Sequence, residues 1–401
     1  MLKLHQVKPL VEAYTDSREP LMSRHTVTGR NPHNGRPLAI TVYDGLIREI
    51  QDGRRDEDVW LSPGLVDLQV NGYGGDDVNH EEPDPETIIS LTRKMIAMGV
   101  TTYLPTIITA AEVRITAALR AIAEARRRSS LVANAVPYVH VEGPSISPTE
   151  GFRGAHPVEH VRPPTLAEFD RWQDASGGLV GMVTLSPHFR EVEEYVPALT
   201  ARGVHVALGH TDASAEEIER AVNAGARLST HLGNGIAGLI PRHSNVLWPQ
   251  LAEDRLTATM IADGHHIPAD MFKVMVRSKG FDRCILVSDT VAVAGMPPGT
   301  YTAPVGGRVE LHADGRLSLA GTEFLAGAAV PLKDGLARAM SMMGSSLADS
   351  LRMATENPGR LVGGLSMLRI GSPADLVRFT IESGGTALKI ASVMVKGLEW
   401  Q

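Results

Sequence analysis

The sequence predicts an α/β protein, a (β/α)8 TIM-type barrel with a small flanking β-sandwich. Short β-rich apolar runs alternate with amphipathic helical stretches from Leu65 onward, and there are eight such runs. Intervening helices favour parallel pairing, and eight parallel strands close as a barrel. Both chain ends alternate like antiparallel strands, which predicts the sandwich. An open doubly wound sheet is the alternative, but no G-x-G-x-x-G follows the first strand.

Each strand is predicted from a run of aliphatic, β-branched and aromatic residues that ends at polar or glycine-containing segments. Several helical stretches between the runs stop at a glycine, as at Gly99, Gly225 and Gly280, and Ser214 begins one with a capped, acidic first turn. The runs are LVDLQV (65–70), TTYLPT (101–106), AVPYVHVEG (135–143), GMVTLSP (181–187), VHVALGH (204–210), RLSTHLG (227–233), ATMIADG (258–264) and CILVSDT (284–290).

The chain ends predict the sandwich and leave the barrel between them. Residues 1–60 form its first part, since Asp44-Gly45 separates two β-rich runs as in a tight hairpin. Residues 366–401 complete it, and residues 61–365 form the barrel. A β insertion near 300–321 follows the eighth strand, where it would cover the barrel mouth.

The composition excludes several classes of function. The 401 residues are 43% hydrophobic, enough for a large core, and the net charge of -7 is not concentrated in long runs of one sign, which argues against nucleic-acid binding. The single cysteine, Cys284, excludes an intrachain disulfide and suits the cytoplasm. The chain begins with no apolar signal core, and no run reaches the roughly 18 apolar residues of a membrane span. We therefore expect a cytoplasmic protein that is not attached to a membrane.

Polar side chains follow the apolar strands at their carboxyl ends, the edge where barrel enzymes carry their active sites. Glu142, His210 and His231 can supply three ligands to Zn²⁺ and leave a fourth position open for water or substrate. Asp289 on the last strand can then act as the general base. In chain order, these strand-end residues are Gln69, Asn71, Glu142, His188, His210, His231, Asp263 and Asp289.

Each member of this set has a structural alternative. A lone buried histidine is more often a hydrogen-bonded core residue than a ligand, Glu142 can cap the loop after it, and Asp289 can cap a helix. The spacing is not a short local motif such as H-E-x-x-H. The four residues nevertheless fall at one edge of different strands, which independent structural roles would not require.

Nine segments, in order and mostly on the predicted strand ends, carry a family resemblance. They are PGLVDLQVNGYGGDD (63–77), HVEGPSISP (140–148), GAHP (154–157), LGHTDAS (208–214), THLGNG (230–235), IADGHHI (261–267), LVSDTVAVAGMPPGTY (286–301), ATENPGRLVG (354–363) and GSPADLV (371–377). Through them the chain resembles the N-acetylglucosamine-6-phosphate deacetylase family of the amidohydrolase superfamily across nearly its whole length.

The resemblance implies one metal per chain. Many amidohydrolases end the first strand with His-x-His, two ligands for a second metal, but this chain has Gln69 and Asn71, as does a subset of the resembled family. A neutral amide is a poorer Zn²⁺ ligand than imidazole. We therefore expect one divalent metal, zinc, on Glu142, His210 and His231. The two amides are expected to hydrogen-bond one another, a water or the carboxylates of the site.

The resemblance also implies the substrate contacts. His156, in GAHP, matches a histidine that contacts the substrate and helps to polarise the acetamide carbonyl; the alternative is a surface loop histidine. Asn234 and Gly235 stand where the family has an Asn-Ala pair that lines the sugar site. His266 matches a histidine near the sugar phosphate, whereas its neighbour His265 has no assigned role.

Two segments depart from the family pattern. After THLGNG the family has a Gly-Arg/Lys-Glu segment that supplies a cation to the phosphate, often across a dimer interface, whereas this chain has LIPRHSN. Arg242 falls near the expected place, and a surface salt bridge is its alternative role. The fourth strand ends Ser186-Pro187-His188, where the family commonly has a glutamate, and the role of His188 is unassigned.

Together these features predict an amidohydrolase that hydrolyses the acetamide of N-acetyl-D-glucosamine 6-phosphate. One alternative is a deacylase for another N-acyl amino sugar, with or without phosphate. Another is a non-catalytic sugar-phosphate-binding barrel, which the presence of both the ligand set and the base argues against. The expected partners are a small-molecule amino sugar and a second copy of the chain in a homodimer, with no nucleic acid and no membrane.

Overall fold

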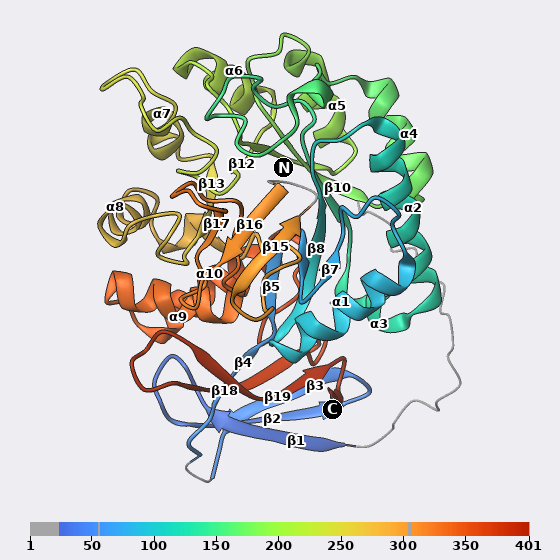
Figure 1. Ribbon diagram of the computed structural model, residues 1–401. Helices are drawn as coiled ribbons and strands as arrows, with labels where there is room; N and C mark the ends of the chain where they lie inside the picture. Colours follow the sequence, from blue (N-terminus) through green and yellow to red (C-terminus); the bar gives the residue numbers. More distant parts are fainter. Residues whose placement is uncertain (1–23, 55–56, 304–306, 401) are drawn as a thin grey trace.

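The computed structural model describes residues 24–54, 57–303 and 307–400. Figure 1 shows a barrel surrounded by helices, with a sheet below it in which blue strands from the start of the chain lie beside red strands from its end. Among the described residues, none of the helices combines the length and the apolar character needed to span a bilayer. The part of the predicted sandwich before residue 24 lies outside the described residues.

The barrel confirms the predicted parallel topology. All eight predicted runs form strands, each pairs in parallel with the next, and the strands are in chain order around the sheet. The seam between the last strand and the first is closed by the amide of Asp289, which donates to the carbonyl of Gln69 at 3.0 Å, and by a bridge between Val70 and Thr290. The strands are β5 (Leu65–Val70), β8 (Val100–Ile107), β9 (Val139–Glu142), β10 (Val180–Leu185), β11 (His205–Leu208), β12 (Leu228–Ser229), β13 (Thr257–Ile261) and β14 (Cys284–Val287).

The helices pack their apolar faces on the outside of the barrel. The predicted caps are present: Ser214 and Glu217 form a capping box at the start of α6 (Ala215–Ala224), and Gly225 ends it. The other helices are α1 (Pro85–Ala97), α2 (Glu112–Arg128), α3 (Ser130–Ala135), η1 (Val158–His160), α4 (Leu166–Ser176), α5 (Val192–Ala201), α7 (Leu247–Ala252), α8 (Ala269–Lys279), η2 (Phe281–Arg283), α9 (Leu332–Met343), α10 (Leu347–Ala354) and α11 (Glu356–Leu361).

Both ends of the described chain meet in one sheet, as predicted. Its order is β20-β19-β18-β4-β1-β2-β3, and its pairs are antiparallel except for β1 with β4, which share a single residue pair. Ile40 and Ile47 from one half pack with Leu61 and Leu376 from the other, so the two halves enclose a common core. The strands are β1 (His25–Arg30), β2 (Pro37–Tyr43), β3 (Leu46–Asp52), β4 (Trp60–Pro63), β18 (Leu376–Ile381), β19 (Leu388–Val395) and β20 (Leu398–Trp400).

The predicted insertion is a three-stranded antiparallel sheet of β15 (Gly299–Ala303), β16 (Gly307–Leu311) and β17 (Leu317–Leu319). Its apolar side packs with Tyr73 of a small hairpin, β6 (Gly72–Tyr73) and β7 (Asp76–Asp77), which follows the first barrel strand. Because that hairpin leaves the carboxyl end of β5, the insertion lies at the end of the barrel where the predicted site residues gather.

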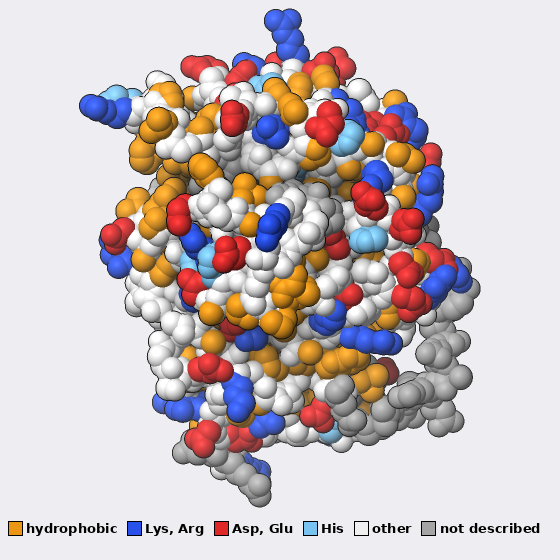
Figure 2. All heavy atoms as spheres, viewed as in Figure 1, with side chains coloured by type: hydrophobic (Ala, Val, Ile, Leu, Met, Phe, Trp, Pro, Cys, Tyr) orange, Lys and Arg blue, Asp and Glu red, His pale blue; other side chains and the backbone are white. Residues whose placement is uncertain are grey.

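Charge is spread over the face of the molecule that Figure 2 shows. In the face shown in Figure 2, basic and acidic side chains are interspersed and neither sign forms a large patch. This distribution agrees with the mixed charge of the sequence and gives a polyanion no extended basic surface on that face.

Candidate active site

Three of the predicted side chains come together at the carboxyl end of the barrel. Glu142 is the last residue of β9, His210 lies just after β11, and His231 lies just after β12. One ligand atom from each lies within 4.8 Å of the others, and all three residues are buried. Glu142 Oε1 is 2.9 Å from His231 Nε2 and 3.5 Å from His210 Nε2. A carboxylate oxygen and two imidazole nitrogens are a donor set that suits a divalent transition metal such as zinc.

The backbone around His210 fixes which ring nitrogen faces the site. His210 Nδ1 lies 3.1 Å from the carbonyl oxygen of Phe152, which can only accept a hydrogen bond. Nδ1 therefore carries a proton, and Nε2, which faces Glu142, is the nitrogen that can bind a cation. Histidines that bind metals use this arrangement, in which a carbonyl orients the ring through its other nitrogen.

The pKa shifts of the cluster favour a negatively charged Glu142, which can bind a cation. Burial alone would raise the pKa of Glu142, but the hydrogen bonds and charges of His210 and His231 outweigh it and hold the pKa well below 4.5. Burial lowers the pKa of His231, yet its bond to Glu142 outweighs burial and raises that pKa above 6.5. A bound divalent cation would take the place of the protons that these groups share, because it binds the carboxylate and neutral imidazoles.

The two amides that end the first strand hydrogen-bond to the carboxylates of the site, one of the three partners expected from the sequence. Gln69 Nε2 donates to Glu142 Oε1 at 2.9 Å, and Asn71 Nδ2 donates to Asp289 Oδ1 at 2.7 Å. Each carboxylate is thus held by one amide, and the amide nitrogens face oxygen acceptors.

Asp289 lies two residues beyond β14 and is partly buried beside the cluster. Burial raises the pKa of Asp289 to about 6, and the negative charge of Glu142 adds to that rise, while His231 opposes it. A carboxylate with a raised pKa, next to a potential metal-bound water, has the basicity that proton abstraction near neutral pH requires.

Three residues of the site have a left-handed backbone. The φ angles of His210, His231 and Asp289 are 47°, 29° and 52°, in a region that non-glycine residues rarely adopt. Each such residue costs roughly 1–3 kcal/mol unless its surroundings enforce it. The turns at these strand ends therefore hold the side chains in place at the expense of local backbone energy.

His156 lies next to the cluster, in the loop after β9. Its Nε2 is 3.8 Å from Glu142 Oε2, and its Nδ1 is 2.8 Å from Thr109 Oγ1. Burial and then the charge of His210 lower the pKa of His156 to about 3, so its ring is neutral at pH 7. Ala155 and Pro157, on either side of it, line with Thr109 a cavity of ≈ 370 Å³. His156 is thus buried beside the cluster and is not a surface loop histidine.

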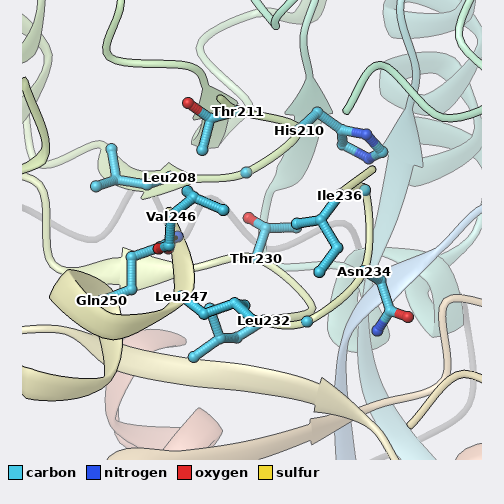
Figure 3. Close-up of a pocket in the computed structure, with 13 residues that line it drawn as sticks. Leu208, His210, Thr211, Thr230, Leu232, Asn234, Ile236, Val246, Leu247 and Gln250 are labelled. Atoms are coloured by element: carbon cyan, nitrogen blue, oxygen red, sulfur yellow. Dashed lines mark hydrogen bonds between the residues drawn. The ribbon is translucent and has the colours of Figure 1, made fainter. Parts of the chain in front are cut away.

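Asn234 and Gly235 form a turn directly behind His210. Asn234 Nδ2 donates to the carbonyl of His231 at 3.2 Å. Both residues line a small cavity of ≈ 10 Å³, and Figure 3 shows Ile236 of the same turn beside the ring of His210. The turn therefore packs against His210, and Asn234 holds the backbone carbonyl of His231 by a hydrogen bond.

We expect Gly235→Ala to weaken metal binding. The added Cβ would lie 2.6 Å from His210 Nδ1, which must then move and lose its bond to Phe152. Losing such an orienting contact typically costs roughly 10- to 100-fold in metal affinity, measured by competition with a chelator. Gly203→Ala is the matched control, because Gly203 also has a positive φ of 80° but no atom within 4 Å of the new Cβ. Equal affinity in both variants would contradict the role of His210 as a ligand.

The two residues predicted to contact phosphate have different surroundings. His266 is mostly buried, and its Nδ1 lies 2.6 Å from Asp263 Oδ2, at the end of β13. Arg242 is exposed on the loop before α7, and its guanidinium has no ion-pair partner among the described residues. Arg242 is not among the residues that line the small cavity bordered by Asn234.

The two unassigned histidines have structural contacts. His188 Nδ1 is 2.6 Å from Ser186 Oγ, and His265 Nε2 is 3.3 Å from the carbonyl oxygen of Asp314 in the insertion. His265 thus links the β13 loop to the insertion. Thr109 and the Phe152 carbonyl were missed from the sequence, because a threonine and a backbone oxygen in loops carry no distinguishing pattern.

A parallel barrel with a buried Glu-His-His cluster and an adjacent aspartate at its carboxyl end has the architecture of a metal-dependent hydrolase. The amidohydrolase family model matches residues 60–399, and the chain belongs to this family. Within it, the relatives described next place the chain in the N-acetylglucosamine-6-phosphate deacetylase family, as the sequence motifs predicted.

These relatives match most of the chain. The N-acetylglucosamine-6-phosphate deacetylase of Bacillus subtilis (strain 168) is 30% identical over 354 residues, which cover 84% of this chain and 87% of that protein. The N-acetylgalactosamine-6-phosphate deacetylase of Escherichia coli O157:H7 is 30% identical over 367 residues, covering 89% and 93%. A mutant of the Mycobacterium smegmatis N-acetyl-D-glucosamine-6-phosphate deacetylase, solved in complex with N-acetyl-D-glucosamine-6-phosphate, superposes with a TM-score of 0.83 at 25% identity over 94% of this chain and 99% of that one.

Proposed function

We propose that the protein hydrolyses the acetamide of N-acetyl-D-glucosamine 6-phosphate to glucosamine 6-phosphate and acetate. The proposal is carried by one observation: Glu142, His210 and His231 converge at the strand ends with Asp289 beside them, in a chain of this deacetylase family. The reaction adds water across the amide, so the water oxygen bonds to the carbonyl carbon, the C–N bond breaks, and one proton moves to the amine.

The residues of the chain divide this work. Glu142, His210 and His231 would hold one zinc ion, which when bound lowers the pKa of a water molecule toward about 7 and polarises the acetamide carbonyl. Asp289 takes the proton of the attacking water and returns it to the amine nitrogen. His156, neutral and fixed by Thr109, contacts the carbonyl oxygen, where negative charge develops.

Asn71 and Gln69 hold the two carboxylates in place for these steps. Asn71 keeps Asp289 aimed by donating to Oδ1, which leaves Oδ2 to accept the proton. Gln69 holds the carboxylate of Glu142, a proposed metal ligand, by donating to its Oε1. Because neither amide is a strong ligand, one metal per chain is proposed.

A substrate series tests the function. Acetate release is measured from N-acetylglucosamine 6-phosphate, N-acetylgalactosamine 6-phosphate and unphosphorylated N-acetylglucosamine with the zinc-loaded protein. We expect the first to have the highest kcat/KM. The galactosamine isomer is the second candidate, since the relative that is 30% identical over 93% of its own length carries that name. Release from none of the three would reject the function and favour a binding role.

We also propose a cytoplasmic homodimer in which Arg242 binds the substrate phosphate of the partner subunit. The buried single cysteine supports a reducing compartment. Arg242 is exposed and has no ion-pair partner among the described residues, which leaves its guanidinium available to a second copy. His266 would approach the same phosphate from within the subunit.

Arg242→Ala should raise KM for the phosphorylated substrate by roughly 10- to 100-fold, because a charge-assisted contact is worth about 1.5–3 kcal/mol. The kcat should change less, since the contact exists before and during the reaction. Arg277→Ala, an exposed arginine of α8, is the control and should leave KM unchanged. If turnover of unphosphorylated substrate suffers equally in Arg242→Ala, the residue is structural.

A further inference from the structure

The first barrel strand breaks its own alternation just before the active site. Leu65 and Val70 both belong to the hydrophobic cluster formed with the outer helices, whereas Val66 and Leu68 belong to the cluster inside the barrel. Residues 65 and 70 are five positions apart, so strict alternation would place them on opposite faces. The pairing of β5 with β8 is irregular between Asp67 and Val70. One extra residue, a β-bulge, therefore reverses the faces within this strand.

The bulge is what turns Gln69 toward the barrel interior. Counted by alternation from Leu65, Gln69 would face the helices, yet its side chain reaches Glu142 in the barrel mouth. The extra residue thus lies between Leu68 and Val70. The site depends on this irregularity, because a regular strand would withdraw the amide from the ligand carboxylate.

The carboxyl group of Asp67 lies at the bulge. It is fully buried, and its Oδ1 accepts from the amide of Gln69 at 3.3 Å and from the amide of Ser288 at 3.1 Å. The first bond is made across the bulge within β5, and the second crosses the seam to Ser288, which follows β14 and precedes Asp289. Oδ2 has no hydrogen-bond partner among the described residues. One oxygen atom therefore joins the bulge to the segment that carries Asp289.

We propose that Asp67 is a positioning residue for the deacetylase reaction: by holding the bulge and the seam together, it places Gln69 on the ligand carboxylate and Asp289 on the attacking water. The proposal rests on the function given above, in which Asp289 is the base. The seam is completed by the amide of Asp289, which donates to the carbonyl of Gln69 at 3.0 Å. A shift of Ser288 or Gln69 would therefore move both carboxylates of the site.

The role requires an acceptor oxygen at this position and does not require a negative charge. Burial raises the pKa of Asp67 to about 7, despite the opposing bonds from Ser288 and Gln69. Asparagine has the same shape and keeps the Oδ1 acceptor, whereas alanine and serine cannot reach the two amides. Asparagine thus removes the charge but keeps the hydrogen bonds, whereas alanine and serine remove both.

The test compares Asp67→Ala with Asp67→Asn. We expect Asp67→Ala to lower kcat by roughly 10- to 100-fold, the effect of misplacing catalytic groups by about an ångström, with KM within about threefold of wild type and one metal per chain retained. Asp67→Asn should restore kcat to within about threefold of wild type. Hydrogen exchange at the amides of Ser288 and Gln69 should accelerate in the alanine variant alone, a readout that does not depend on the substrate.

Asp375→Ala is the matched control. Asp375 is also a buried carboxyl with a raised pKa, and its Oδ1 accepts from the amide of Lys396 at 2.7 Å, but it lies in the flanking sheet. It should lower the melting temperature while leaving kcat unchanged. If Asp67→Ala does not fold, Asp67→Ser, which keeps a polar group at the buried position, takes its place.

Three results would overturn the proposal. They are an unchanged kcat in Asp67→Ala, a kcat in Asp67→Asn as low as in Asp67→Ala, and an alanine variant whose amide exchange at Ser288 equals that of wild type. A wild-type protein that releases no acetate would instead refute the proposed function, and the exchange experiment would still decide whether Asp67 holds the bulge.

Discussion

Asp289→Asn is expected to lower kcat by on the order of 10²-fold or more while the metal stays bound. Asparagine keeps the shape of the side chain and the acceptor that receives the hydrogen bond from Asn71, but it cannot take a proton from water. Activity is measured by acetate release, and the metal content of the same sample by elemental analysis. Near-normal turnover in a metal-loaded variant would show that Asp289 is not the base. Asp282→Asn, at an exposed aspartate of η2, is the control.

The same assignment fixes the sign of the pH dependence. Burial and the charge of Glu142 raise the pKa of Asp289 to about 6, and a bound cation can only lower it. Because the base works as a carboxylate, kcat/KM should fall about tenfold per pH unit below a midpoint at or under about 6. In Asp289→Asn this acid limb should disappear from the residual activity. An acid limb centred well above pH 6 would point to another group.

Glu142→Gln is expected to remove the metal. The wild-type protein should contain close to one equivalent, since Gln69 and Asn71 are weak ligands, and the variant should contain little after dialysis. The substitution leaves the hydrogen bond from Gln69 possible but removes the only carboxylate of the cluster. Losing several kcal/mol of stabilisation by the cation corresponds to a loss of roughly 10³-fold in kcat.

Glu168→Gln is the control for Glu142→Gln, because it also removes a buried carboxylate but leaves the proposed metal ligands intact. Glu168 is buried on α4, where Arg162 binds it, and it lies outside the metal cluster. This control should keep its metal and most of its activity. Two tightly held equivalents in the wild-type protein, or a full equivalent in Glu142→Gln, would contradict the single site on Glu142, His210 and His231.

Much of the fold was predictable because its signals are local. The barrel strands are short runs rich in aliphatic and β-branched residues, bounded by turn residues, and Ser214 with Glu217 marks a helix start by chemistry that acts within one turn. The run from 135 to 143 was predicted too long at its start. Val139 begins the strand, and Ala135 ends the short helix α3, where an apolar segment shorter than two turns has no distinguishable period.

The sequence predicted the candidate site residues that follow strands. It did not predict the positions that depend on irregular backbone, such as a bulge or a loop. Glu142, His210, His231 and Asp289 follow strands in the sequence, and parallel topology brings those ends together. The side of the strand on which Gln69 lies depends on a β-bulge, and no residue type in LVDLQV predicts that bulge. The position of Arg242 depends on a loop without regular structure, which propensities and periodicity do not determine.

The left-handed backbone at His210, His231 and Asp289 has a consequence for how such a protein evolves. Glycine adopts this left-handed conformation without steric strain, whereas histidine and aspartate adopt it at a cost in backbone energy. A gene copy released from selection for hydrolysis could therefore gain stability by replacing any of the three. Selection for folding alone would replace these catalytic residues while the barrel was kept. An intact set of the three residues therefore indicates selection for catalysis.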